Sequence, residues 1–132
     1  YELISKACEI MISKLQIFYE KAGASSIEIT QADSTMPWSL DIKLENESYT
    51  LGKVIEYTMN KKFYTEGKLL TFIGFRQEHP HDTDSFIRVA FDPKSAEDTP
   101  SYDKFKTACL TLIQSACTDS IEIFREIASE FN

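Results

Sequence analysis

Apolar residues recur every three or four positions over the first 22 residues, which predicts an amphipathic helix. Leu3, Ala7 and Ile10 add a second apolar flank to this helix. Gly23 follows the last periodic residue, where a left-handed C-terminal cap favours glycine, so we expect the helix to end there. The main stripe consists of Ile4, Cys8, Met11, Leu15, Phe18 and Ala22.

Alternation of apolar and polar residues predicts strands farther along the chain. The first runs from Trp38 to Glu45, with Trp38, Leu40, Ile42 and Leu44 on one face and Ser39, Asp41 and Lys43 on the other. Two more runs, Lys68 to Arg76 and Asp84 to Phe91, predict a hairpin. The preceding segment, residues 23–37, is small and polar, so we interpret it as a linker or an irregular strap.

Two more helices are predicted. One carries Leu51, Val54, Ile55, Thr58 and Met59 on a single face, has Ser48 or Thr50 as its candidate N-cap, and ends near Gly67. The other follows Pro100 and Ser101 and runs from about Tyr102 to Phe131. At 1.5 Å per residue its length is about 45 Å. A globule of this size is only about 30 Å across, so we expect the helix to overhang its own domain.

This order of elements predicts an α+β fold: a small antiparallel sheet with helices on one face and a long C-terminal helix. Both end helices are apolar on more than one side, so we expect another polypeptide to cover part of them. In the simpler alternative, the first and last helices pack on each other and bury all of these residues.

Composition narrows the classes of function. The formal charge is −7, which disfavours binding to a phosphate backbone. The three cysteines lie in helical patterns without C-x-x-C spacing, as buried thiols of a reducing compartment do. No membrane span or signal peptide is recognisable, so we expect a soluble intracellular protein with no membrane contact.

Candidate chemistry is sparse. His79, His81, Asp82 and Asp84 offer metal-binding groups, but four ligands on one short loop with Pro80 seldom converge, and turn chemistry explains the Pro and Asp residues. Cys109 lies on the apolar face of the last helix, which favours packing over nucleophilic catalysis. The lysines at 53, 61, 62 and 68 fit a solvated surface better than a polyanion site. We therefore expect no catalytic residue, metal or cofactor.

Two motifs carry a resemblance to a known family. The run NESYTLGKVI, residues 46–55, resembles the motif that opens the first helix of the smaller α-like subunit of multisubunit RNA polymerases, the archaeal subunit L type. The run FIGFRQEHP, residues 72–80, resembles the F-x-G-Y-x-x-x-H-P motif of the same family. The spacing between the two motifs and the long last helix also agree with this family. The resemblance covers about Trp38 to Asn132. Ser48, Tyr49 and Lys53 stand where the family has an acidic residue, His and Asn, so polar contacts made through those residues are not carried over to this chain.

The resemblance implies a dimerisation-type fold and a non-catalytic role in assembling DNA-dependent RNA polymerase. Residues 1–22 resemble the last helix of the larger α-like subunit, 23–37 would be the linker, and 38–132 the small α-like domain, as in fused subunits of large DNA viruses. Thr50, Leu51, Gly52, Gly74, His79 and Pro80 would have structural roles. The partners would be the larger α-like subunit or domain and the two large polymerase subunits, in the virion and host cytoplasm if viral and otherwise in the nucleus.

The predicted interface combines both end helices with the start of the second helix. Its residues are Ile4, Cys8, Met11, Leu15, Phe18, Thr50, Leu51, Gly52, Leu112, Ala116, Ile123, Phe124 and Ile127. One alternative is a self-associating α+β module unrelated to transcription. Another is a small hydrolase that uses His79 and Cys109, which requires the two side chains within hydrogen-bond reach.

Overall fold

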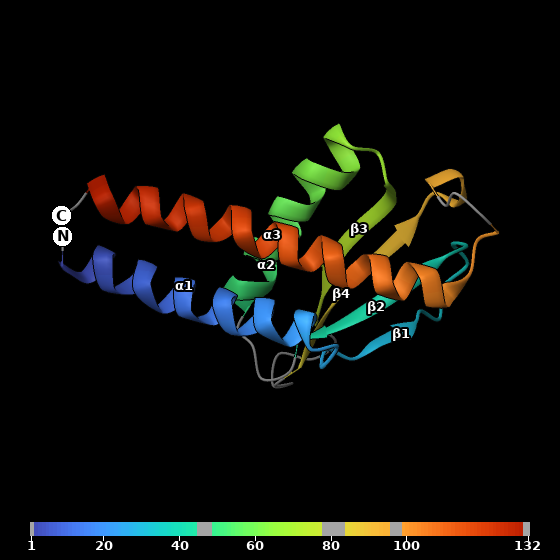
Figure 1. Ribbon diagram of the computed structural model, residues 1–132, viewed down its shortest axis with the longest axis horizontal. Helices are drawn as coiled ribbons and strands as arrows, with labels where there is room; N and C mark the ends of the chain where they lie inside the picture. Colours follow the sequence, from blue (N-terminus) through green and yellow to red (C-terminus); the bar gives the residue numbers. More distant parts are fainter. Residues whose placement is uncertain (1, 45–48, 78–83, 96–98, 131–132) are drawn as a thin grey trace.

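The computed structural model describes residues 2–44, 49–77, 84–95 and 99–130, and it has the predicted α+β class (Figure 1). Three long helices and a four-stranded sheet make up most of the chain. The elements in order are α1 (Glu2–Gly23), β1 (Ile29–Gln31), β2 (Ser39–Leu44), α2 (Tyr49–Met59), the π-helix η1 (Asn60–Glu66), β3 (Leu70–Arg76), β4 (Ser85–Phe91), the short 3-10 helix η2 (Pro93–Ser95) and α3 (Tyr102–Glu130).

The sheet is antiparallel throughout, with strand order β1-β2-β4-β3. Leu40 pairs with Val89 and Ile42 with Ile87, so the apolar positions of β2 and β4 share one face. All four side chains are fully buried, as their alternation predicted. This inner face forms the floor of the hydrophobic core.

The helices cover the inner face of the sheet. Phe105 of α3 stacks on Phe91 of β4, with ring centroids 4.6 Å apart. Leu15 and Phe18 of α1 belong to the same core. Figure 1 shows α1 and α3 running antiparallel and side by side, with their outer ends extending beyond the sheet and α2. We call this protruding pair of helix ends the arm, and it confirms the predicted overhang.

Strand β1 lies within the segment that was interpreted as a linker or strap. It pairs with β2, with Ile29 opposite Ile42. Backbone hydrogen bonds extend the pairing on both sides, from Lys43 N to Glu28 O at 2.9 Å and from Ala32 N to Ser39 O at 3.0 Å. Three residues with a single large apolar side chain give too short a pattern to recognise in the sequence.

The second helix ends near Gly67 as predicted, but its last seven residues form the π-helix η1 instead of continuing the α-helix. Phe63 of η1 is buried in the core. The N–H of Gly67 donates a hydrogen bond to the carbonyl of Lys62 at the end of this element. Capping of the second helix by Ser48 lies outside the described residues, and Thr50 lies inside α2, so it is not the cap.

Two details at the strand and helix ends complete the comparison with the sequence. Trp38 has a positive φ of 57° and precedes β2, so it is not part of that strand as expected. It still packs against the core, with its ring against Tyr102 and Phe105 at the start of α3. Ser101 caps α3 as predicted, because its Oγ accepts a hydrogen bond from Lys104 N at 3.2 Å.

The outer face of the sheet carries an ion pair where a solvent-exposed carboxylate was expected. Asp41 is buried and accepts two hydrogen bonds from Arg88, at 2.8 and 3.1 Å. Arg76 lies 3.8 Å from the same carboxylate. The polar face of β2 is therefore shielded by neighbouring side chains rather than by a second layer of helices.

Candidate protein-interaction site

About half of the predicted interface is buried within the chain itself, most of it where the two end helices pack on each other. The simpler alternative thus describes part of the molecule correctly. These buried residues are Cys8, Leu15, Phe18, Leu51, Gly52, Leu112 and Ala116. Since they are buried, they are inaccessible to a partner while the chain stays folded.

The same apolar stripes become accessible toward the outer ends of α1 and α3, which extend beyond the sheet and α2 (Figure 1). Ile4 of α1 is 40% exposed, and Ile123 and Ile127 of α3 are 46% and 37% exposed. Met11 and Phe124 are partly buried against the edge of the core. The two helices therefore do not bury all of their apolar residues by packing together.

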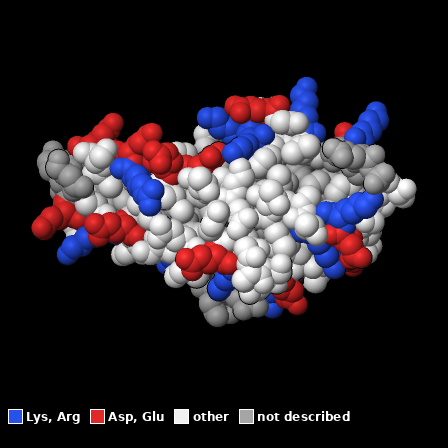
Figure 2. All heavy atoms as spheres, viewed as in Figure 1, with Lys and Arg blue, Asp and Glu red and all other residues white. Residues whose placement is uncertain are grey.

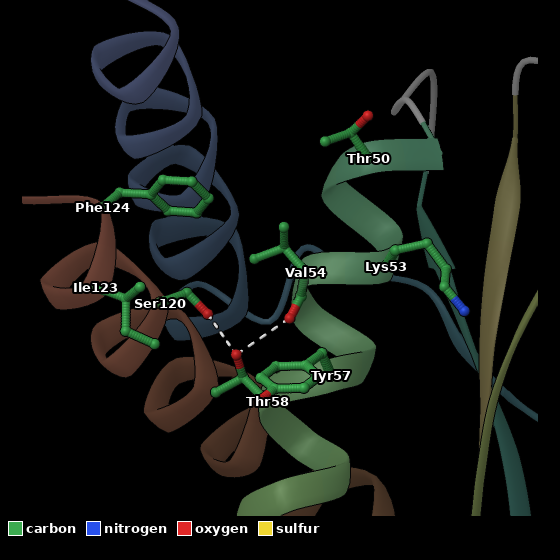
Figure 3. A pocket seen from close by; sticks show the side chains of 8 residues that line it. All are labelled: Thr50, Lys53, Val54, Tyr57, Thr58, Ser120, Ile123 and Phe124. Atoms are coloured by element: carbon green, nitrogen blue, oxygen red, sulfur yellow. Dashed lines mark hydrogen bonds between the residues drawn. The ribbon is translucent and has the colours of Figure 1, made fainter. Parts of the chain in front are cut away.

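A groove between α2 and α3 continues this apolar surface (Figure 3). It has a volume of about 390 Å³, and Val54 and Tyr57 line it from α2 while Ile123 and Phe124 line it from α3. Lys53 directs its ammonium group away from α3 in this view and pairs with Glu56 at 3.0 Å. The interior of the groove is accordingly almost free of charge.

The floor of the groove contains one buried polar pair. The hydroxyls of Thr58 and Ser120 lie 2.8 Å apart, and the Thr58 hydroxyl also donates to Val54 O at 3.1 Å. These hydrogen bonds satisfy both buried hydroxyls, so the floor needs no ligand to compensate them. The arrangement suits an apolar occupant, held by shape and burial rather than by directed polar contacts.

Charges surround this surface unevenly. Figure 2 shows acidic side chains gathered along the outer end of α3, whereas the middle of the same face has few charged groups. Near η1, Lys62 forms an ion pair with Asp119 and a hydrogen bond to Ser115, at 3.0 and 2.6 Å. Lys61 and Lys68 are exposed, as expected for a solvated surface.

The start of α2 was predicted to offer three contact residues, but only one of them is accessible. Thr50 is exposed at one end of the groove, whereas Leu51 is fully buried. Gly52 faces the ring of Phe75, where an added Cβ would lie 2.1 Å from Cε2. The glycine therefore permits close approach between α2 and β3.

The described residues offer little support for a catalytic or metal-binding site. Burial raises the pKa of the Cys117 thiol from its ordinary value of 9.0 to about 12 and also raises the pKa of Cys109, so neither is disposed to form a thiolate. Asp84 forms an ion pair with Lys43 at 3.6 Å. His79, His81 and Asp82, and with them the metal and hydrolase hypotheses, lie outside the described residues.

Outside those gaps, no group of three or more possible metal ligands is present, and no described helix is long and apolar enough to cross a membrane.

The predicted interface left out two sets of accessible residues. Val54 and Tyr57 form one wall of the groove, and Tyr57 is 66% exposed. Leu3 and Ile10, the second apolar flank of the first helix, are exposed together with Ile17. Their spacing was visible in the sequence, but periodicity alone does not reveal which apolar flank another element covers.

Neither a protein-family profile nor a curated protein sequence shows a significant match to this chain.

Proposed function

We propose that this protein is a non-catalytic assembly subunit of a DNA-dependent RNA polymerase. It would form a dimerisation platform with a larger α-like subunit or domain, on which the two large subunits assemble. The two sequence motifs support this proposal, together with an element order that suits such a platform. Residues 1–22 would belong to the larger α-like portion and 38–132 to the small α-like domain.

One observation carries the proposal: the arm and the adjoining α2–α3 groove expose several large apolar side chains. Ile123 contributes to both parts, with Ile127 and Ile4 farther out and Tyr57 across the groove. Burying side chains of this size is worth roughly 1.5 to 3 kcal/mol each. Such a surface favours association with another polypeptide over catalysis.

The test is purification of the tagged chain from its native source, followed by mass spectrometry of the proteins that remain bound. We expect the two large polymerase subunits in the purified material. Ile123→Glu combined with Ile127→Glu should remove them, because charged side chains would enter the apolar contact. Phe72→Glu is the matched control, since Phe72 is similarly exposed, at 38%, but lies on the outer face of the sheet.

Two outcomes would count against the proposal. Recovery of a folded chain without polymerase subunits would refute it. If light scattering then showed a stable homodimer that the double variant dissociates, the alternative of a self-associating module would take its place.

A further inference from the structure

Helix α1 has a second apolar stripe besides the one that packs into the core. Leu3, Ile10 and Ile17 are spaced seven residues apart and are 82%, 59% and 53% exposed. We call them the outer stripe. The residues four positions after each of them complete a line that advances by steps of four and three, which is the heptad repeat of a coiled-coil seam. These residues are Ala7, Lys14 and Lys21.

A row of exposed polar residues flanks this seam on one side. Lys6, Ser13 and Glu20 are also spaced seven residues apart, each three positions after a member of the outer stripe. Two such rows that run in opposite directions are complementary to each other. Lys6 of each copy faces Glu20 of the other copy, and the two Ser13 residues meet at the centre. Charges that flank a seam in this way set partner choice and orientation in coiled coils.

Neither charge of this row is neutralised by another described residue. Among the ion pairs formed within the described part of the chain, none involves Lys6 or Glu20. Glu20 borders a polar groove between α1 and α3, with Arg125 on the opposite wall, but no ion pair joins the two. Both side chains are therefore available to a second copy.

The residues on the seam itself fit the same antiparallel register. When Lys6 faces Glu20 of the other copy, each small or charged residue of the seam lies opposite a large aliphatic one. The facing pairs are Ala7 with the partner's Ile17, Lys14 with the partner's Ile10, and Lys21 with the partner's Leu3. The aliphatic stem of a lysine can pack on such a residue while its ammonium group stays in water.

A parallel pair would lack these advantages. It would place Lys14 opposite Lys14 and Lys21 opposite Lys21, and such contacts are repulsive. Lysine on a seam fixes orientation and register at a cost in stability, so we expect a reversible dimer. The helix has three lysines and three glutamates, so two copies of α1 meet without net charge although the whole chain carries −7.

We propose that the outer stripe is a self-association surface, at which α1 of one copy packs antiparallel against α1 of a second copy. The contact is isologous, because the same residues contribute from both sides, and it closes as a dimer. It goes beyond the function proposed above and uses neither the α2–α3 groove nor Ile123 and Ile127 of the arm.

An anionic membrane fits the outer stripe less well than a second copy. The net charge of −7 and the acidic end of α3 would oppose binding to such a membrane (Figure 2). Glu20 lies in the same row as Lys6, so the flank of the stripe is not uniformly basic. A narrow heptad seam also matches a helix better than a flat bilayer surface.

The test is sedimentation velocity of the complete chain over a range of concentrations, which should show a reversible dimer. Lys6→Glu alone and Glu20→Lys alone each turn both ion pairs into like-charge contacts. Each variant should dimerise about tenfold more weakly. An equal mixture of the two variants should recover the original dimerisation, because the mixed dimer again has two attractive pairs. The differences should shrink at high salt.

Matched controls separate the contact from general charge effects. Lys61→Glu and Glu66→Lys make the same changes of charge on η1 and should leave dimerisation unaltered. Ile10→Ser combined with Ile17→Ser should abolish the dimer. Both of these isoleucines are more than half exposed, so circular dichroism should show an unaltered fold.

A chain that stays monomeric up to about 1 mM would overturn the proposal. So would a dimer that the mixture of Lys6→Glu and Glu20→Lys does not restore. A dimer that Ile123→Glu and Ile127→Glu dissociate would assign self-association to the groove instead, and binding of phosphatidylserine vesicles through Lys6 would assign the stripe to lipid. No polymerase subunit takes part, so these results are independent of the function proposed above.

Discussion

At the residue scale, Gly52 controls how closely α2 approaches β3. An added Cβ would lie 2.1 Å from Cε2 and 2.6 Å from Cδ2 of Phe75, well inside van der Waals contact. Gly52→Ala should therefore destabilise the protein by about 1 to 3 kcal/mol, although alanine is the better helix former. Urea unfolding followed by circular dichroism measures the difference.

A double variant separates this clash from other effects of the substitution. Phe75→Leu alone should cost stability, but in the Gly52→Ala background it should cost less, because the smaller side chain relieves the overlap. Strictly additive effects would show that the two residues do not interact. This glycine lies in the YTLGKV run that carries the resemblance, but only the folded structure shows the aromatic ring against it.

The buried cysteines predict how stability changes at alkaline pH. Below about pH 9 the thiols are protonated in both states, so their contribution is fully present. Above it the unfolded chain loses thiol protons while the folded chain, with a Cys117 pKa of about 12 and a raised Cys109 pKa, keeps them. The free energy of unfolding should then fall by up to about 1.4 kcal/mol per pH unit for each thiol.

Denaturant titrations at several alkaline pH values test this expectation. A variant with Cys109→Ala and Cys117→Ala should be less stable but should show a shallower decline with pH. Ile113→Val, another core substitution, is the control for destabilisation alone and should keep the steeper decline. Parallel declines in all three proteins would mean that other groups cause the pH dependence.

At the element scale, two contacts hold η1 to the rest of the protein, and they contribute unequally to stability. Lys62 pairs with Asp119, but the two side chains are 39% and 45% exposed, so water weakens the pair to at most about 1 kcal/mol. Phe63 is buried in the core, and phenylalanine truncation costs about 3 to 5 kcal/mol. Phe63→Ala should therefore lower the urea midpoint far more than Lys62→Ala, and a larger effect of Lys62→Ala would contradict this view.

The elements also show what sequence periodicity can reveal. The hydrophobic periodicity predicted which side chains of β2, β4, α1 and α3 face the core. It could do so because each of these elements spans at least two repeats of its period. Strand β1 has only three residues, and its pairing depends on β2 being beside it. The π-helical geometry of η1 could not be predicted, because an α-helix would satisfy the same hydrophobic pattern.

At the scale of the whole molecule, α1 is an integral part of the core. Leu15, Phe18 and Ala22 are buried among residues of the rest of the chain. A chain reduced to residues 38–132 would expose the α3 surface that they cover, so we expect it to lose cooperative unfolding. Adding a peptide of residues 1–22 should restore a cooperative thermal transition, and a shortened chain that is already cooperative would contradict this expectation.

The candidate site could be predicted only in part from the sequence. Apolar stripes on both ends of the chain indicated contact with other polypeptide, and Ile4, Ile123 and Ile127 are indeed accessible. The sequence did not show that Leu15 and Leu112 are buried in one shared core. Apolar stripes on two helices that lie far apart in the sequence do not reveal whether the helices pack on each other. The groove also needs α2 and α3 side by side.

The antiparallel course of α1 and α3 has a mechanical consequence. Since the first turn of α1 lies beside the last turn of α3, tension applied at these two points acts across the pair rather than along it (Figure 1). Such a load opens contacts one turn after another, beginning at the tip of the arm. The sheet and its aromatic stack would bear force only after the helices had been unzipped, so the arm is the mechanically weak part of the fold.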